Sequence, residues 1–303
     1  MIKKVMIGAI ALGVMLSSCN NDDDNSGTDS NVANLNIDLK GLEDLGDGYL
    51  YEGWIIVDGA PVSTGTFSVD GEGALSQKAF EVTKTSLETA TAFVLTIEPD
   101  PDSDPAPADT KLLLAEFGSG NTASVSLAPV AEGDFATSSG DFFLRSPTDE
   151  ASGTANNMND QYGVWFGQPA MPPLATLNLP TLNAGWKYEG WVVTENGPLS
   201  TGTFTAVNEA DDNAGSPEGF SGTESFGPPI PGEDFFRNAP EGVTFPLDVR
   251  GKTVVISVEP FPDNSPAPFL LKPLVGTAGT ETAPTHYPFG LNAASFPSGT
   301  VSR

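Results

Sequence analysis

The sequence predicts an all-β protein made of two similar antiparallel β-sandwich-like domains in tandem. Three observations carry this prediction. The 303-residue chain contains 33 glycines and 26 prolines, which interrupt helices and mark turns. Apolar residues alternate in short runs, as at Leu35, Ile37 and Leu39, which would share one face of a strand. Long parts of the sequence also occur twice.

The duplication is clearest in an aromatic segment that leads into a hairpin. Residues 51–67 read YEGWIIVDGAPVSTGTF, and residues 188–204 read YEGWVVTENGPLSTGTF. An Asp-Gly pair in the first copy and an Asn-Gly pair in the second predict tight turns, because both residue types tolerate positive φ. We therefore expect residues 51–54 to pair with residues 63–67. Gly65 and Gly202 predict a bulge or a close approach of the backbone.

The two copies match again further along the chain, at VLTIEPDPDSDPAP from Val94 and VISVEPFPDNSPAP from Val255. The segment before this second match is longer in the second copy and rich in glycine, proline and acid, which predicts a long surface loop. In this interpretation the first copy continues through GDFFLRSPTD at Gly140 and YGVWFG at Tyr162. The chain is long for a single core, so the predicted domains are residues 34–172 and 173–303.

The N-terminal residues predict export and a lipid anchor. Residues 1–18 are typical of a signal peptide, because Lys3 and Lys4 precede an apolar run that is too short to span a bilayer. The following LSSC resembles the bacterial lipobox, in which the cysteine, here Cys19, is lipidated; a chance cysteine is the alternative. Residues 19–33 are polar and acidic, which predicts a disordered tether.

The acidic cluster that starts at Asp22 resembles the export signal of lipoproteins of the Bacteroidetes type. This resemblance implies an outer-membrane lipoprotein exposed at the cell surface, with a periplasm-facing protein as the alternative. Cys19 is the only cysteine, so we expect no disulfide within the chain.

Charge narrows the classes of partner. The formal net charge is −27, which argues against nucleic acid, because phosphate backbones are bound by basic surfaces. The same negative charge is compatible with divalent cations as partners. Asp100, Asp102 and Asp104 alternate as in a calcium loop, but Pro105 and Lys111 stand where an EF-hand has glycine and glutamate. A weak Ca²⁺ site of another kind is left as an alternative.

The order of the repeated motifs resembles the extracytoplasmic C-terminal domain of anti-sigma-K factors. In that family a Y-x-x-W strand, a P-V-S-x-G-x-F segment and a V-T-x-E-P…S-P-A-P segment follow one another. Both copies contain this series, at Tyr51, Trp54, 61–67, 96–99 and 105–107, and at Tyr188, Trp191, 198–204, 257–260 and 265–268. The resemblance implies a sensor or binding module. It does not include the cytoplasmic helical domain with which anti-sigma factors bind sigma factors, so we expect no direct sigma-factor binding.

No residue pattern indicates catalysis, a cofactor or a catalytic metal. His286 is the only histidine, and neither a Gly-x-Ser-x-Gly nor a His-Glu-x-x-His motif is present. We therefore predict a protein that is not an enzyme. A hydrolase that uses paired carboxylates is the most remote alternative.

Candidate binding residues form two groups. The first consists of aromatic residues that could stack on sugars, although aromatic residues on strands more often belong to a core: Tyr51, Trp54, Tyr188 and Trp191. The second consists of acidic residues in the long segment of the second copy: Asp211, Asp212, Glu233 and Asp234. Glu52 and Glu189 raise a separate question, because a buried carboxylate needs a partner. The expected function is binding of an envelope protein or glycan. The alternative is a structural or adhesion lipoprotein that binds divalent cations weakly.

Overall fold

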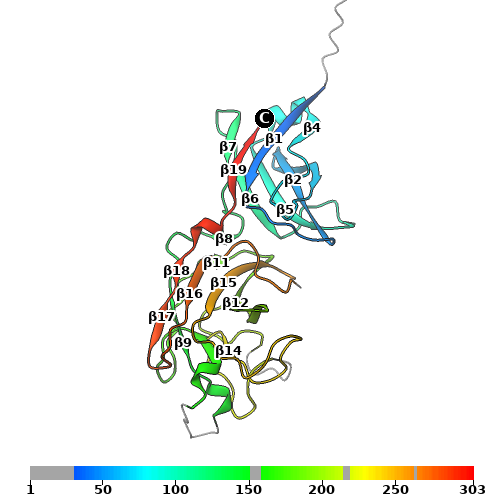
Figure 1. The fold of residues 1–303 in the computed structure, drawn as a ribbon. Coiled ribbons are helices and arrows are strands. Elements are labelled where there is room, and N and C mark those ends of the chain that lie inside the picture. The colour runs from blue at the N-terminus through cyan, green and yellow to red at the C-terminus, as the bar shows by residue number, and fades with distance from the viewer. Residues whose placement is uncertain (1–30, 151–157, 214–218, 263–264) are drawn as a thin grey trace, which may run out of the picture. The chain divides into compact units, whose positions relative to one another are not determined.

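The computed structural model describes residues 31–150, 158–213, 219–262 and 265–303, and residues from Val32 to Arg303 form one compact unit. The predicted all-β class is confirmed (Figure 1). Within the described ranges, the helical elements are α1 (Lys84–Thr89) and three 3₁₀ turns, Pro147–Asp149, Asp160–Tyr162 and Ala293–Ser295. None of these helices is long and apolar enough to cross a membrane. The predicted signal peptide and Cys19 lie outside the described residues, as does the predicted tether up to residue 30.

The repeated motifs form two equivalent sheets. In the first copy the strand order is β3-β2-β5-β6, and in the second copy it is β13-β12-β15-β16-β18. The strands of the first sheet are β2 (Tyr49–Val57), β3 (Ala60–Phe67), β5 (Ala92–Pro99) and β6 (Lys111–Glu116). Those of the second sheet are β12 (Trp186–Thr194), β13 (Gly197–Phe204), β15 (Thr253–Pro260), β16 (Leu274–Thr277) and β18 (Gly290–Leu291).

The predicted hairpin pairing is confirmed. Strand β2 pairs with β3 so that Tyr51 lies opposite Phe67, and the register shifts between Gly53 and Trp54. The second copy has the same shift at the equivalent place. Gly65, in the strand opposite the shift, has a φ of 119°, a conformation that glycine adopts readily. Both residues of the Asp-Gly turn have positive φ, as the predicted turn requires.

Each of the two copies is completed by a second sheet. One has the order β4-β1-β19-β7 and the other β14-β10-β9-β17. Their strands are β1 (Val32–Lys40), β4 (Ala79–Thr83), β7 (Thr122–Ser124), β9 (Asp141–Leu144), β10 (Gly163–Phe166), β14 (Gly232–Asp234), β17 (His286–Pro288) and β19 (Ser298–Ser302). We call the sheets that contain β2 and β1 module 1, and the sheets that contain β12 and β10 module 2. The short strands β8 (Ala131–Glu132) and β11 (Thr181–Leu182) pair with each other.

The two modules exchange one strand. In both second sheets, the first strand of the order follows the repeated hairpin, the second precedes it, and the fourth follows β6 or β16. The third position is occupied by β19 in module 1 and by β9 in module 2. Along the chain, β9 follows the module 1 strands that end with β7, and β19 follows the module 2 strands that end with β18. Each module is therefore completed by the strand that follows the other module.

The strand exchange gives a different division of the chain from the domain boundary expected near residue 172. Residues 141–144 and 163–166, which the sequence assigned to the first copy, form β9 and β10 and pair with β17 and β14 of module 2. Strand β19 pairs with β1 and β7 of module 1. Apolar alternation identifies these segments as strands but does not identify their partners, because any open strand edge offers the same backbone groups.

The long segment of the second copy is also not wholly a surface loop. Its strand β14 pairs with β10, and Glu233, Asp234 and Phe235 are fully buried. The acidic composition suggested that this segment is exposed. Hydrogen bonds to the buried carboxylates instead replace the hydration that they lose on burial.

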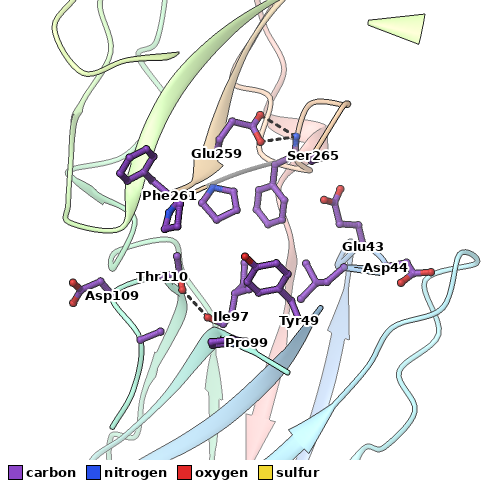
Figure 2. A pocket seen from close by; sticks show the side chains of 15 residues that line it. Glu43, Asp44, Tyr49, Ile97, Pro99, Asp109, Thr110, Glu259, Phe261 and Ser265 are labelled. Atoms are coloured by element: carbon purple, nitrogen blue, oxygen red, sulfur yellow. Dashed lines mark hydrogen bonds between the residues drawn. The ribbon is translucent and has the colours of Figure 1, made fainter. Parts of the chain in front are cut away.

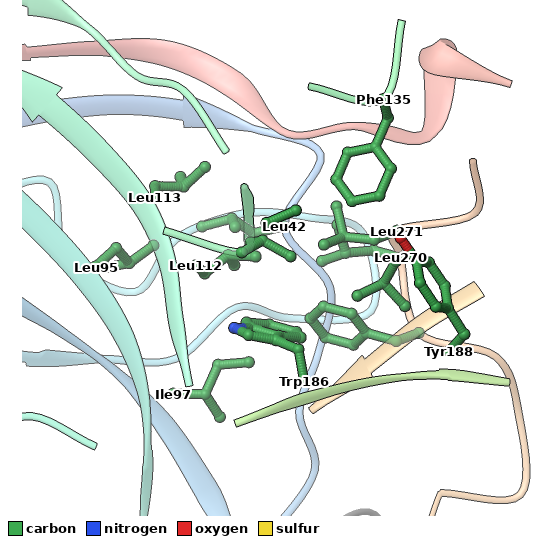
Figure 3. Close-up of a cluster of buried hydrophobic side chains, with 14 of the residues drawn as sticks. Leu42, Leu95, Ile97, Leu112, Leu113, Phe135, Trp186, Tyr188, Leu270 and Leu271 are labelled. Atoms are coloured by element: carbon green, nitrogen blue, oxygen red, sulfur yellow. The ribbon is translucent and has the colours of Figure 1, made fainter. Parts of the chain in front are cut away.

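One hydrophobic core runs through both modules. The predicted alternation is confirmed in β1, where Leu35, Ile37 and Leu39 are buried. Figure 3 shows how the modules meet, with Trp186 of module 2 lying among side chains of module 1 that include Ile97 and Leu112. This continuity explains why the described unit is compact.

The strand exchange predicts where a core mutation in β19 acts. Val301 is fully buried and lies opposite Ile37 of β1 and Ala123 of β7. We expect Val301→Ala to reduce the free energy of unfolding by about 2 kcal/mol through lost burial and a residual cavity. Hydrogen exchange should accelerate in β1 and β7, which are distant in sequence. Thr300→Ala, at a partly exposed neighbouring position, is the control. Acceleration confined to β9 and β10 would contradict the exchange.

Candidate functional site

The repeated motif forms a buried chain of hydrogen bonds in module 1. The indole Nε1 of Trp54 donates to Thr96 Oγ1 at 2.9 Å, and Thr96 Oγ1 donates to Glu98 Oε1 at 2.5 Å. The same carboxylate oxygen accepts from the backbone N–H of Ala108 at 2.9 Å. Burial raises the pKa of Glu98, and these hydrogen bonds oppose that rise. The chain thus joins β2 and β5 to the proline-rich loop that follows β5.

Module 2 repeats this chain. Trp191 Nε1 donates to Ser257 Oγ at 2.7 Å, and Ser257 Oγ donates to Glu259 Oε1. The backbone N–H of Phe269 donates to Glu259 Oε1 at 2.9 Å. The three conserved elements of the repeat, tryptophan, hydroxyl residue and glutamate, therefore have one structural role in both copies.

The second glutamate of each repeat has a partner in the hairpin. Ser63 Oγ donates to Glu52 Oε1, and Ser200 Oγ donates to Glu189 Oε1. Glu52 is 9% exposed and Glu189 is 6% exposed. These bonds cross between the two hairpin strands and answer the question that the sequence raised about Glu52 and Glu189.

The structure places the repeated aromatic candidates in the core. Tyr51, Trp54, Tyr188 and Trp191 are all at most 3% exposed. The hydroxyl of Tyr51 donates to the backbone oxygen of Glu43, and that of Tyr188 donates to the backbone oxygen of Pro180. These rings pack inside the sheets and present no surface on which a sugar could stack.

The acidic candidates lie near one another in module 2 but differ in exposure. Asp234 is fully buried and accepts from Trp165 Nε1 at 2.8 Å and from Thr148 Oγ1 at 2.6 Å. Glu233 is also fully buried and accepts from the backbone N–H of Phe220 at 3.2 Å.

The other two acidic candidates are adjacent in the sequence but have different partners. Asp211 is buried and accepts from the backbone N–H of Gly232 at 2.8 Å. Asp212 is more exposed and forms an ion pair with Lys187 at 3.0 Å. Three of the four acidic candidates are therefore buried acceptors, and one is part of a surface ion pair.

Burial changes the acidity of the central pair. It raises the pKa of Glu233 to about 7, against opposing hydrogen bonds, with Asp211 adding to the rise. It also raises the pKa of Asp234 well above its usual value. The described residues contain no group of three or more histidine, cysteine or acidic side chains arranged to hold a metal ion. In the loop after β5, Asp102 and Asp104 are exposed and accept hydrogen bonds from nearby backbone N–H groups.

A pocket of about 360 Å³ lies where the equivalent ends of the two repeats meet (Figure 2). Its walls come from the segment before β2, the first residue of β2, the end of β5 and the loop before β6 in module 1, and from the end of β15 and the following loop in module 2. The lining residues are Glu43, Asp44, Leu45, Tyr49, Ile97, Pro99, Ala108, Asp109, Thr110, Glu259, Pro260, Phe261, Pro262, Ser265 and Phe269. Sequence reasoning missed this site, although its Glu-Pro segments belong to the repeat.

The same backbone contact positions both walls. The N–H of Asp100 donates to the carbonyl of Gly48 at 2.8 Å, and the N–H of Phe261 donates to the carbonyl of Gly185 at 2.8 Å. Each contact joins the residue after a Glu-Pro pair to the residue before an aromatic strand. The side chain of Phe261 is left 50% exposed, and Lys187 Nζ lies 4.2 Å from the centre of its ring.

Comparison with known families supports the resemblance for the first copy. Residues 28–111 match the family model described as "Anti-sigma-K factor rskA, C-terminal". The match covers the chain from before β1 to the first residue of β6, which includes all three motifs of the first copy. No curated protein and no solved structure matches the chain.

The buried chain predicts a clear stability loss when its central hydroxyl is removed. Thr96→Val keeps the shape of the side chain but leaves the Trp54 N–H without its acceptor and removes one donor to Glu98. We expect the free energy of unfolding in urea to fall by about 1 to 3 kcal/mol. Thr89→Val, at an exposed position in α1, should change it by less than about 0.5 kcal/mol. Equal effects of the two substitutions would refute this role of Thr96.

The raised pKa of Glu233 predicts that the stability of the folded protein falls as pH rises. Its pKa is about 7 in the folded protein and 4.5 in a solvent-exposed chain, so the folded state holds the proton more tightly between these values. The free energy of unfolding should therefore decrease from pH 5 to pH 8, with Glu233 contributing up to about 3 kcal/mol. Glu233→Gln should reduce this decrease, measured by urea unfolding, whereas Glu72→Gln at an exposed position should not. An unchanged pH dependence in Glu233→Gln would exclude Glu233 as its source.

Proposed function

We propose that this protein is a non-enzymatic extracytoplasmic lipoprotein whose two modules recognise an envelope protein or glycan at the pocket between them. The observation that carries the proposal is the position of the pocket. Equivalent Glu-Pro segments of the two repeats form its opposite walls, so the duplication itself creates the concave surface. Ligand sites occur preferentially at such interfaces between structural units.

The match of residues 28–111 to an anti-sigma-K factor C-terminal domain supports a sensory or binding role. We do not expect this protein to bind a sigma factor directly. The buried hydrogen-bond chains account for the repeated polar residues as elements of the fold, which leaves the loops at the strand ends as the candidate binding surface.

The sequence before the described residues supports the proposed location. The apolar run followed by LSSC is the basis for proposing a lipid on Cys19, and the acidic residues from Asp22 are the basis for proposing the outer face of the outer membrane. A tether of this kind would hold the pocket near other envelope components.

Site-specific photocrosslinking in cells that produce the protein tests this proposal. A photoreactive benzoylphenylalanine replaces Phe261 at the pocket or, as a matched control, Phe226. Both side chains are exposed, by 50% and 87%, so neither replacement should disturb the core. We expect a discrete covalent adduct from position 261 and none from position 226, with mass spectrometry identifying protein or glycan.

The same experiment with Cys19→Ala tests the anchor. This variant should move from the membrane fraction to the soluble fraction, and its adduct at position 261 should decrease if the partner is a membrane component. Equal adducts at positions 261 and 226, or none at either, would contradict recognition at the pocket. Retention of the Cys19→Ala variant in the membrane would contradict the lipid anchor.

A further inference from the structure

We propose that the inter-module pocket binds a short segment of a partner protein in which a large apolar side chain is flanked by lysine or arginine. This inference rests on the proposed function and deepens it, because it selects a protein segment over a glycan and specifies its chemistry.

The floor of the pocket is apolar and partly aromatic. Tyr49 and Ile97 of module 1 face Phe261 of module 2 across the space (Figure 2), and several prolines complete the lining. An aliphatic or aromatic side chain that binds here would bury apolar surface against the walls, and each Å² removed from water would stabilise binding by roughly 25 cal/mol. The floor therefore favours a large apolar group.

The rim is acidic. Four of the residues that line the pocket are Glu43, Asp44, Asp109 and Glu259, and no lysine, arginine or histidine is among the described residues of its lining. Glu259 is buried and accepts a hydrogen bond from the backbone of its own loop. Asp44 and Asp109 are exposed, and Asp109 Oδ1 forms a surface ion pair with Lys111 Nζ at 3.8 Å, which is weak enough for a partner cation to replace. A cationic group beside the apolar one would meet these two carboxylates, and the net charge of −27 would attract a basic segment from a distance.

The ring of Phe261 already demonstrates this chemistry within the chain. Lys187 Nζ lies 4.2 Å from its centre, a distance typical of cation–π contacts. A lysine or arginine of the partner could use the same kind of contact at the half-exposed ring.

The polar groups inside the pocket do not favour a sugar. Thr110 Oγ1 donates to the backbone oxygen of Ile97 at 2.7 Å, and Glu259 accepts from the backbone N–H of Phe269. A sugar ring brings many hydroxyl groups whose hydrogen bonds with water must be replaced. The volume of about 360 Å³ is at the lower end of the range for ligand pockets, which suits one or two side chains of an extended segment.

Peptide titration tests the inference without knowledge of the natural partner. The whole chain carrying Cys19→Ala is titrated with three blocked pentapeptides, GKFKG, GEFEG and GKGKG, and separately with chitotetraose. Binding is measured from changes in NMR chemical shifts. We expect GKFKG to bind at least about tenfold more tightly than either other peptide, because they lack the cations or the apolar side chain. Chitotetraose should not compete with GKFKG.

Two pairs of variants locate the binding. Phe261→Ala should weaken GKFKG binding by about tenfold, whereas Phe226→Ala should not change it. The double variant Asp44→Asn with Asp109→Asn should weaken it by about threefold to tenfold, and this difference should shrink at high salt. The matched double variant Asp58→Asn with Glu72→Gln removes the same charge at exposed positions outside this pocket and should have a smaller effect.

The outcomes separate this inference from the proposed function. Equal binding of GKFKG and GEFEG, binding unaffected by Phe261→Ala, or binding of chitotetraose in place of GKFKG would each overturn the inference. A glycan adduct at position 261 in cells would also overturn it while leaving the proposed function intact. Specific GKFKG binding without any cellular adduct would sustain the site and count against the envelope role.

Discussion

The exchange of β9 and β19 is the constraint on which the rest of the structure depends. Each strand occupies the gap between the second and fourth strands of the other module's sheet, so two backbone ladders in each module require the other half of the chain. The exchange keeps the modules in contact through one continuous core. It also holds the Glu-Pro segments of both repeats opposite each other, and the pocket lies between them. A simple tandem joined by a flexible linker would leave that juxtaposition to a weak interface between independent domains.

The buried polar chains set the internal geometry of each module. A carboxylate removed from water is destabilising unless hydrogen bonds replace its hydration, and Glu98 and Glu259 receive these bonds from a side-chain hydroxyl and a loop N–H. A register error would leave several of these groups without partners, which makes such networks specific as well as rigid. The loop that carries the pocket wall in each module is thus fixed by the same bonds that fix the strands.

Much of the fold follows from the sequence, and the reasons for the failures are physical. The hairpin pairing and the Asp-Gly turn depend on neighbouring residues, so the Tyr51 to Phe67 segment predicts them correctly. Strands β9 and β19 could each pair with the equivalent sheet edge of either module. Which edge they join depends on contacts distant in the sequence, which a local pattern does not encode. Burial of Glu233 and Asp234 was missed because composition indicated solvent, whereas Ser221, Thr148 and Trp165 bind them. The pocket was missed because it needs residues from both repeats, although Phe261 belongs to a repeated segment.

The position of β19 also determines the order in which the protein can fold. The first sheet of module 1 is made entirely of strands that lie before residue 117, but β1 and β7 cannot gain their common neighbour until residues 298–302 are available. Contacts of such long sequence separation slow folding, because the chain must close a large loop before they form. Folding during synthesis or export would therefore leave module 1 open until all of module 2 had emerged. Throughout that interval the exposed edges of β1 and β7 would be available for aggregation or chaperone binding.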